Sequence, residues 1–241
     1  APAYRTALTV SGLVTAIAAY HYFRIFESWS AAFSVRDGVV TATGLLFNDA
    51  YRYVDWLLTV PLLLIELVLV MRLSSSETAS KATRLGFAAA LMIILGYPGE
   101  IATDNTTRAI WGAISSIPFA YIVYELFVGL GAAIQRQPEG ARVLVNRARW
   151  LIFASWGFYP IVYMMPFTSF SGSSVETGLQ IGYTIADLIA KAGVGVLVFM
   201  IAVRKSAAEG YENGVLAGAP GLPADGSPAA SHVAGQPDTR N

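Results

Sequence analysis

The sequence contains no cysteine, and only 13% of its 241 residues are charged. Without cysteine the chain has no disulfides and no thiolate ligands for a metal. Its two histidines, His21 and His232, lie too far apart in the sequence to predict a zinc site. Sixteen basic and sixteen acidic residues give a formal net charge of zero, so no basic surface predicts binding to nucleic acid. The N-terminal residues APAYR also lack the basic region and short apolar stretch of a signal peptide.

Hydrophobic residues, in contrast, are abundant and make up 55% of the chain. A bilayer core of roughly 30 Å is crossed by about 20 mostly apolar residues in a helix. Six stretches meet this requirement, at about residues 5–28, 50–72, 82–103, 108–133, 147–168 and 178–203. Residues 1–206 are therefore expected to form an all-α transmembrane bundle. Residues 207–241 are rich in Gly, Ala, Pro and Ser and predict a disordered tail.

The distribution of lysine and arginine predicts how the bundle lies in the cell membrane. Loops that stay in the cytoplasm carry an excess of these residues. Fewer of them lie at the opposite ends of the spans, where residues 29–49 alternate polar and β-branched side chains and predict a loop with a short hairpin. Both termini are therefore expected in the cytoplasm. The basic residues on that side are Arg5, Arg72, Lys81, Arg84, Arg136, Arg142, Arg147, Arg149, Arg204 and Lys205.

A lysine lies near the middle of the last span, where an ionisable group is costly and indicates function. Lys191 is more than one turn from either end of that span, so it is poorly placed to reach the membrane surface. Asp187 lies four residues earlier, on the same helical face. The pair is compatible with a neutralised buried ion pair. It also suits an amine held in a dry apolar pocket, ready to form a Schiff base.

The second span carries the densest set of polar residues, in the stretch RYVDWLLTVPLLLIEL. Asp55 and Thr59 share a helical face, and Glu66 lies three turns beyond Asp55, roughly 16 Å along the helix. Two carboxylates at different depths on one face suit a proton path, in which one accepts a proton and the other supplies one. The alternative is a set of hydrogen bonds between helices. His21, in AAYHYFRIF of the first span, is by itself compatible with a packed polar side chain.

These motifs resemble the microbial rhodopsins. RYVDWLLTVP followed by a carboxylate, together with DxxxK in the last span, is similar to the proton-pumping proteorhodopsin and xanthorhodopsin group. The resemblance covers about residues 4–205. It implies a light-driven outward proton pump, not an enzyme, with the seven-helix rhodopsin bundle as its fold. The chain matches this family from the second helix onward, so the first helix is expected to be missing and six spans remain.

The resemblance implies a role for each polar residue in the spans. Lys191 would bind all-trans retinal as a protonated Schiff base, with Asp55 as main counterion and proton acceptor. Asp187 would be the second counterion, and Arg52 would complete the group of charges.

Three further roles in proton transfer follow from the same resemblance. Thr59 would assist near the Schiff base, and Glu66 would be the cytoplasmic proton donor. His21 matches the histidine that pairs with the acceptor aspartate in this group, so its titration would be coupled to that of the aspartate.

The resemblance also predicts the retinal pocket, which aromatic rings would line without offering polar competition. Leu63 occupies the position that tunes colour, and leucine there implies green absorption. The expected pocket residues are Trp56, Pro61, Leu63, Met92, Gly96, Trp156, Tyr159, Pro160 and Tyr163.

Gly112, in IWGAISSIPFAYIVY, matches a glycine that opens a window onto the retinal ring, where a carotenoid antenna lies. The alternative is a small residue that permits close helix contact. Membrane lipid, retinal, a carotenoid and further copies of the chain are the expected partners. Two other functions stay open at this point: a photosensory rhodopsin that signals to a partner, and a six-span transporter without a chromophore.

Overall fold

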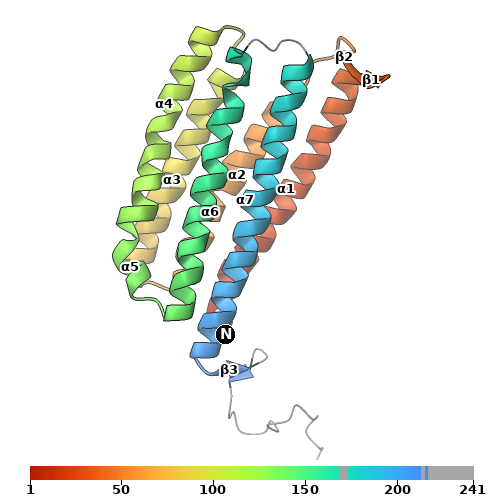
Figure 1. Cartoon of the computed structure of the whole chain (residues 1–241). Coiled ribbons are helices and arrows are strands. Elements are labelled where there is room, and N and C mark those ends of the chain that lie inside the picture. Colours follow the sequence, from red (N-terminus) through yellow and green to blue (C-terminus); the bar gives the residue numbers. More distant parts are fainter. Residues whose placement is uncertain (169–172, 213–214, 217–241) are drawn as a thin grey trace, which may run out of the picture.

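The computed structural model describes residues 1–168, 173–212 and 215–216, and in this part of the chain six long helices lie side by side (Figure 1). They are α1 (Arg5–Ala32), α2 (Ala50–Met71), α3 (Ser75–Glu100), α4 (Asn105–Tyr124), α6 (Glu139–Tyr163) and α7 (Ser173–Ala208). Shorter helical elements are η1 (Pro2–Tyr4), η2 (Glu125–Gly129), α5 (Gly131–Gln135) and η3 (Met165–Phe167). The strands are β1 (Phe33–Arg36), β2 (Val39–Ala42), β3 (Tyr211–Glu212) and β4 (Val215–Leu216).

The six long helices correspond to the six expected spans, and the expected helical bundle is confirmed. Among the described residues, five helices are long and apolar enough to cross a membrane. The exception is α1, which is long enough at 28 residues but contains Ser, Thr, His and charged side chains that lower its mean hydropathy. The fourth span continues from α4 through η2 into α5, so that it runs over Asn105–Gln135.

The hairpin expected in residues 29–49 is present as the antiparallel pair β1–β2, with Phe33 opposite Ala42 and Arg36 opposite Val39. Asp37 and Gly38 form its turn, both with positive φ (54° and 78°). Asp-Gly is favoured in such two-residue turns because both positions require a left-handed backbone. The preceding helix ends at Ala32, four residues later than the expected boundary.

The expected end of the bundle at residue 206 is also too early, because α7 continues to Ala208. The short antiparallel pair β3–β4 follows, with Tyr211 opposite Leu216. Residues 213–214 and 217–241 of the expected tail lie outside the described residues. In Figure 1 the N-terminus and β3 lie at one end of the bundle, and β1 and β2 lie at the other.

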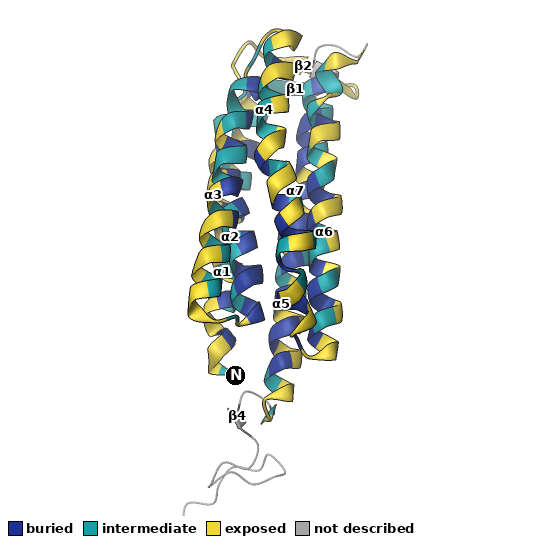
Figure 2. Cartoon of the chain, turned by 90° about the vertical axis from the view of Figure 1, so that its left-hand side faces the viewer, coloured by how far each residue is buried: buried dark blue, intermediate teal, exposed yellow. Residues whose placement is uncertain are grey.

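Helices α1 to α4 pack against their neighbours along the chain, α6 packs against α7, and α7 returns to contact both α1 and α2. Exposed residues gather on the outward faces of the helices and buried ones face the interior (Figure 2). Among the five apolar spans, α2 has the largest buried share. This central position surrounds the polar side chains of α2 with protein on every side, which positions the candidate site.

Candidate functional site

The side chain of Lys191 on α7 is buried and reaches across the bundle to α2. Its Nζ donates hydrogen bonds to Asp55 Oδ2 and to Asp187 Oδ2, the latter at 3.0 Å. Asp55 is fully buried, and Asp187 and Lys191 are 1% and 7% exposed. A buried cation of this kind is tolerable only because the carboxylates neutralise it. The structure therefore brings together the three charged residues that the sequence places on two separate spans.

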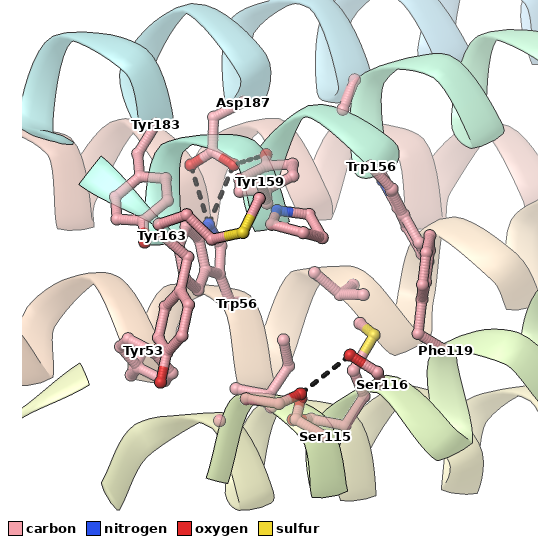
Figure 3. A pocket seen from close by; sticks show the side chains of 18 of the residues that line it. Tyr53, Trp56, Ser115, Ser116, Phe119, Trp156, Tyr159, Tyr163, Tyr183 and Asp187 are labelled. Carbon is pink, nitrogen blue, oxygen red and sulfur yellow. Dashed lines mark hydrogen bonds between the residues drawn. The ribbon is translucent and has the colours of Figure 1, made fainter. Parts of the chain in front are cut away.

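Asp187 is held by three donors in addition to Lys191, and Figure 3 shows two of them, Trp56 and Tyr159. Its oxygens accept hydrogen bonds from Trp56 Nε1 at 2.9 and 3.1 Å, from Tyr22 at 2.6 Å and from Tyr159. The guanidinium of Arg52 lies 3.8 Å from Asp187 Oδ2. Four donors and a nearby cation fix this carboxylate in one position.

Arg52 extends the polar network from Asp187 towards the hairpin end of the bundle. Its Nε and Nη2 donate to Gln180 Oε1 at 3.2 and 2.7 Å. Gln180 Nε2 in turn donates to Glu176 at 2.9 Å and to Asp49 at 3.4 Å. Burial, followed by the negative charges of Glu176 and Glu100, raises the pKa of Asp49, just outside α2, from 3.8 to about 7.

Glu66 lies far along α2 from this network and is fully buried. Neither oxygen of its carboxyl has a hydrogen-bond partner among the described residues. Thr59 is buried between the two carboxylates, and its hydroxyl donates to the Asp55 carbonyl at 2.7 Å, so it bonds its own helix.

His21 is buried on α1, and its Nδ1 lies 2.9 Å from the Ile17 carbonyl oxygen. Asp55 Oδ1 has no hydrogen-bond partner among the described residues, so no direct hydrogen bond joins the expected pair. The structure buries His21 on α1 without bonding it to the aspartate.

A cavity of about 460 Å³ opens beside Lys191, between α2, α3, α4, α6 and α7. In Figure 3, Trp156 and Phe119 lie together on one side, and Tyr53 and Tyr163 on the other. Eight of the nine expected pocket residues and Gly112 line it. These are Trp56, Leu63, Met92, Gly96, Gly112, Trp156, Tyr159, Pro160 and Tyr163.

Pro61 is the expected pocket residue that does not line the cavity. Trp56, Val60 and Leu63 do so at helical spacing, whereas Pro61 points about 100° away from Val60 on the same helix. Its ring lies instead towards α3, about 4.0 Å from the position of a Cβ at Gly86.

Several contributors were missed by the sequence analysis. Tyr22 follows His21 directly, and nothing in its local pattern distinguishes it from its neighbour Tyr20. Tyr183 lines the cavity and lies four residues before Asp187, so helical spacing was a usable signal. Glu100 accepts from Tyr183 at 3.2 Å and from Arg108 at 3.5 Å, a contact between helices that no sequence spacing indicates.

The comparisons with known proteins agree with this geometry. A family model described as "Bacteriorhodopsin-like protein" matches residues 1–205. The green-light absorbing proteorhodopsin of Gamma-proteobacterium EBAC31A08 is 31% identical over 206 residues, which cover 84% of this chain and 76% of the relative.

Two solved structures are similar over most of their length. Xanthorhodopsin, described as a light-driven ion pump with dual chromophore, is 55% identical with a TM-score of 0.80, covering 88% of this chain and 85% of the other. A thermophilic rhodopsin is 49% identical with a TM-score of 0.82, at the same coverage. The fold is the transmembrane bundle of the seven-helix rhodopsins, and the chain is a multi-pass membrane protein that belongs to the bacteriorhodopsin-like family.

Proposed function

We propose that this chain is a light-driven outward proton pump that binds all-trans retinal covalently at Lys191. The observation that carries the proposal is the position of the Lys191 amine. It lies at the wall of an apolar, aromatic-lined cavity and is held there between the carboxylates of Asp55 and Asp187. An amine in such a place is available to a carbonyl ligand and shielded from water.

The chemistry of the cavity walls suits retinal, which is almost entirely apolar. These walls are mostly aliphatic and aromatic, with Trp56 and Trp156 among them. The charged groups of the cavity, Asp187 and Lys191, belong to one cluster. A polyene gains from aromatic packing and has no polar groups to satisfy, so one reactive amine in an otherwise apolar cavity is the arrangement it needs.

When bound, retinal would supply the absorption of visible light and an isomerisation that reorients the Lys191 nitrogen. The residues of the chain would then carry the proton. Lys191 passes its proton to Asp55 Oδ2, the carboxylate oxygen to which it already donates. Asp187 keeps its four other contacts, stays ionised and stabilises the remaining charges. His21, buried on α1, is the residue that we assign as the partner of Asp55, as the family resemblance implies.

Glu66 returns a proton to the Lys191 nitrogen from the opposite side. The direction of transport follows from the places of the two carboxylates on α2. Asp55 lies near the start of this helix, towards the hairpin, and Glu66 lies near its end. Arg72 and Lys205 are among the basic residues at the Glu66 end, so this end and the C-terminus face the cytoplasm. The proton therefore moves outward.

Adding retinal to the purified protein tests the proposal directly. We expect a visible absorption band, fixed to the protein by borohydride, and its loss in Lys191→Ala. In vesicles that hold the protein in its cellular orientation, light should move protons outward, from the Glu66 end of the bundle to the Asp55 end. Glu66→Gln should keep the band but slow reprotonation of the Lys191 nitrogen at least tenfold. Absence of a band with retinal would overturn the assignment, and a band without proton transport would indicate a sensor.

We propose in addition that a carotenoid antenna lies against Gly112. The cavity reaches the outer surface of the bundle here, because Ala109, Ala113 and Ser116 of α4 line it and are also exposed. A Cβ at Gly112 would lie 2.8 Å from Cε1 of Tyr163, so a larger side chain would fill this opening. The similar xanthorhodopsin carries a dual chromophore.

Carotenoid addition tests this second proposal. We expect structured blue bands in the action spectrum of transport, and their loss in Gly112→Trp while the retinal band persists. If no carotenoid adds to the action spectrum of the unaltered chain, Gly112 serves helix packing alone.

A further inference from the structure

Arg108 and Glu100 form a buried ion pair that the proposed proton transfer does not use. The two residues are only 7% and 6% exposed, and Nη1 of the guanidinium lies 3.5 Å from Glu100 Oε2. Burying two charges is costly even when they neutralise each other, and such a pair is often no more stabilising than apolar residues of the same size. The pair therefore calls for a role beyond stability, and the other contacts of Arg108 indicate one.

Arg108 lies in the first turn of α4 and reaches the ends of two other helices. Its Nη2 donates to the carbonyl of Glu100, the last residue of α3, at 2.6 Å. Its Nη1 donates to the carbonyl of Tyr163, the last residue of α6, at 3.5 Å. The last carbonyls of a helix have no partner within it, so a cation is favourable there. Arg108 thus joins α3, α4 and α6 at one end of the bundle.

The side chain of Tyr163 is held by the same arginine. Its ring lies under the guanidinium, with Cζ of Arg108 4.9 Å from the ring centroid, and its hydroxyl donates to the Arg108 carbonyl at 2.8 Å. A Cβ at Gly99 would overlap with this hydroxyl, and a Cβ at Gly112 would lie 2.8 Å from Cε1 of the ring. The ring therefore lies in a slot between two glycines, one on α3 and one on α4.

Tyr163 is a wall of the cavity and lies at one end of it (Figure 3). A second wall residue depends on the same ion pair, because Tyr183 donates to Glu100 Oε2 at 3.2 Å. Neither Arg108 nor Glu100 lines the cavity itself. The ion pair thus lies behind two of the aromatic walls and contacts both of them.

We propose that Arg108 is a positioning residue for the retinal pocket, and that it fixes the ring of Tyr163 as the cavity wall beside Gly112. Glu100 neutralises the guanidinium and links it to Tyr183. The inference rests on the proposed binding of retinal, because a wall that moved would open the covalent linkage to water. It adds a residue of α4 that acts through Tyr163 and touches no reacting atom.

The mobility of the Tyr163 ring tests the inference in the protein without retinal. With isotopically labelled tyrosine rings, NMR measures how fast each ring flips, and the signals of Tyr163 are identified by their loss in Tyr163→Phe. The double variant Arg108→Gln/Glu100→Gln leaves no unpaired charge. Its Tyr163 ring should flip about tenfold faster, the factor for one lost cation–π contact in a desolvated place. An unchanged flip rate would overturn the inference.

Arg108→Lys provides a second variant, which keeps a positive charge opposite Glu100. A compact ammonium cannot donate to both helix ends as the planar guanidinium does. The Tyr163 ring should therefore flip faster than in the unaltered chain and more slowly than in the double variant. A rate equal to that of the unaltered chain would show that charge alone suffices, and would overturn the role assigned to the guanidinium.

With retinal bound, bleaching by hydroxylamine in the dark measures access to the covalent linkage. In Arg108→Gln/Glu100→Gln the visible band should still form, and bleaching should be about tenfold faster for the same reason. Unchanged bleaching would mean that Arg108 does not position the pocket wall. Failure of the proposed function looks different, because the unaltered chain would then form no band while the flip rate of Tyr163 still responded to Arg108.

Lys81→Gln/Glu125→Gln is the matched control. This ion pair also joins α3 to the fourth span, at 2.8 Å, but neither of its residues lines the cavity. The control should lower the thermal unfolding midpoint and leave both the Tyr163 flip rate and the bleaching rate as they are. Equal acceleration in the control would indicate a general loosening of the bundle and would overturn the specific role of Arg108.

Discussion

At the scale of single residues, the site depends on the balance of charge around Lys191. Lys191 and Arg52 face Asp55 and Asp187 inside the bundle, so two positive and two negative groups lie together. Only a neutral set of this kind is tolerable at such depth. Truncating one member leaves the others unbalanced, so substitutions here are expected to affect folding and chemistry together.

Asp49 offers a prediction on stability against pH. Its pKa is raised from 3.8 to about 7, so the folded chain keeps a proton that the unfolded chain has released. The free energy of unfolding should therefore fall as the pH rises from about 4 to about 7, by up to about 4 kcal/mol. Asp49→Asn cannot ionise, so its thermal unfolding midpoint should decline less over this range.

The exposed hairpin residue Asp37 supplies the control for this measurement, since Asp37→Asn should leave the pH profile of unfolding as it is. Parallel profiles for Asp49→Asn and the unaltered protein would contradict the prediction.

At the scale of elements, the fourth span contains a π-helical turn, η2, that accommodates a carboxylate. The Leu130 amide bonds the Glu125 carbonyl five residues back at 2.8 Å, which defines the wider turn. Glu125 accepts from Lys81 of α3 at 2.8 Å and from Tyr121 at 3.2 Å. A Cβ at Gly129 would overlap with the Glu125 carboxylate. The glycine therefore permits an ion pair that joins two neighbouring helices.

Gly129→Ala should disrupt this pairing and lower the free energy of unfolding by about 1–3 kcal/mol, despite the better helix propensity of alanine. Gly131→Ala is the matched control, because a Cβ there meets nothing within 4 Å. It should be neutral or stabilise by up to about 1 kcal/mol. Thermal unfolding in detergent measures both, and equal effects of the two substitutions would contradict the steric argument.

At the scale of the whole molecule, the buried Lys205 ties together three segments at the end of the bundle opposite the hairpin. From α7 its Nζ donates to the carbonyls of Val70 and Met71 at the end of α2, at 3.2 and 2.6 Å. It also donates to Gln137, between α5 and α6, at 2.8 Å. A lysine at a helix C-terminus satisfies carbonyls that have no partner within the helix.

Lys205→Met should leave these carbonyls without their donor and lower the free energy of unfolding by about 1–3 kcal/mol. Arg204→Met removes a charge one residue earlier, from an exposed position, and should change stability by less than about 0.5 kcal/mol. Denaturation followed by loss of helical circular dichroism compares the two. Equal stabilities would show that Lys205 does not hold the bundle together.

The sequence by itself determined the spans, the hairpin and the identity of the central residues, because each depends on local properties. Apolar length predicts a membrane helix, Asp37-Gly38 predicts a tight turn, and Lys191 in mid-span is conspicuous against apolar neighbours. The tertiary structure decided what depends on contacts between distant segments. It placed Tyr22 and Trp56 on Asp187, turned Pro61 away from the cavity and left His21 without a bond to Asp55. Only the packing of α1 and α2 against α7 brings these side chains together, so no local pattern in the sequence indicates the contacts.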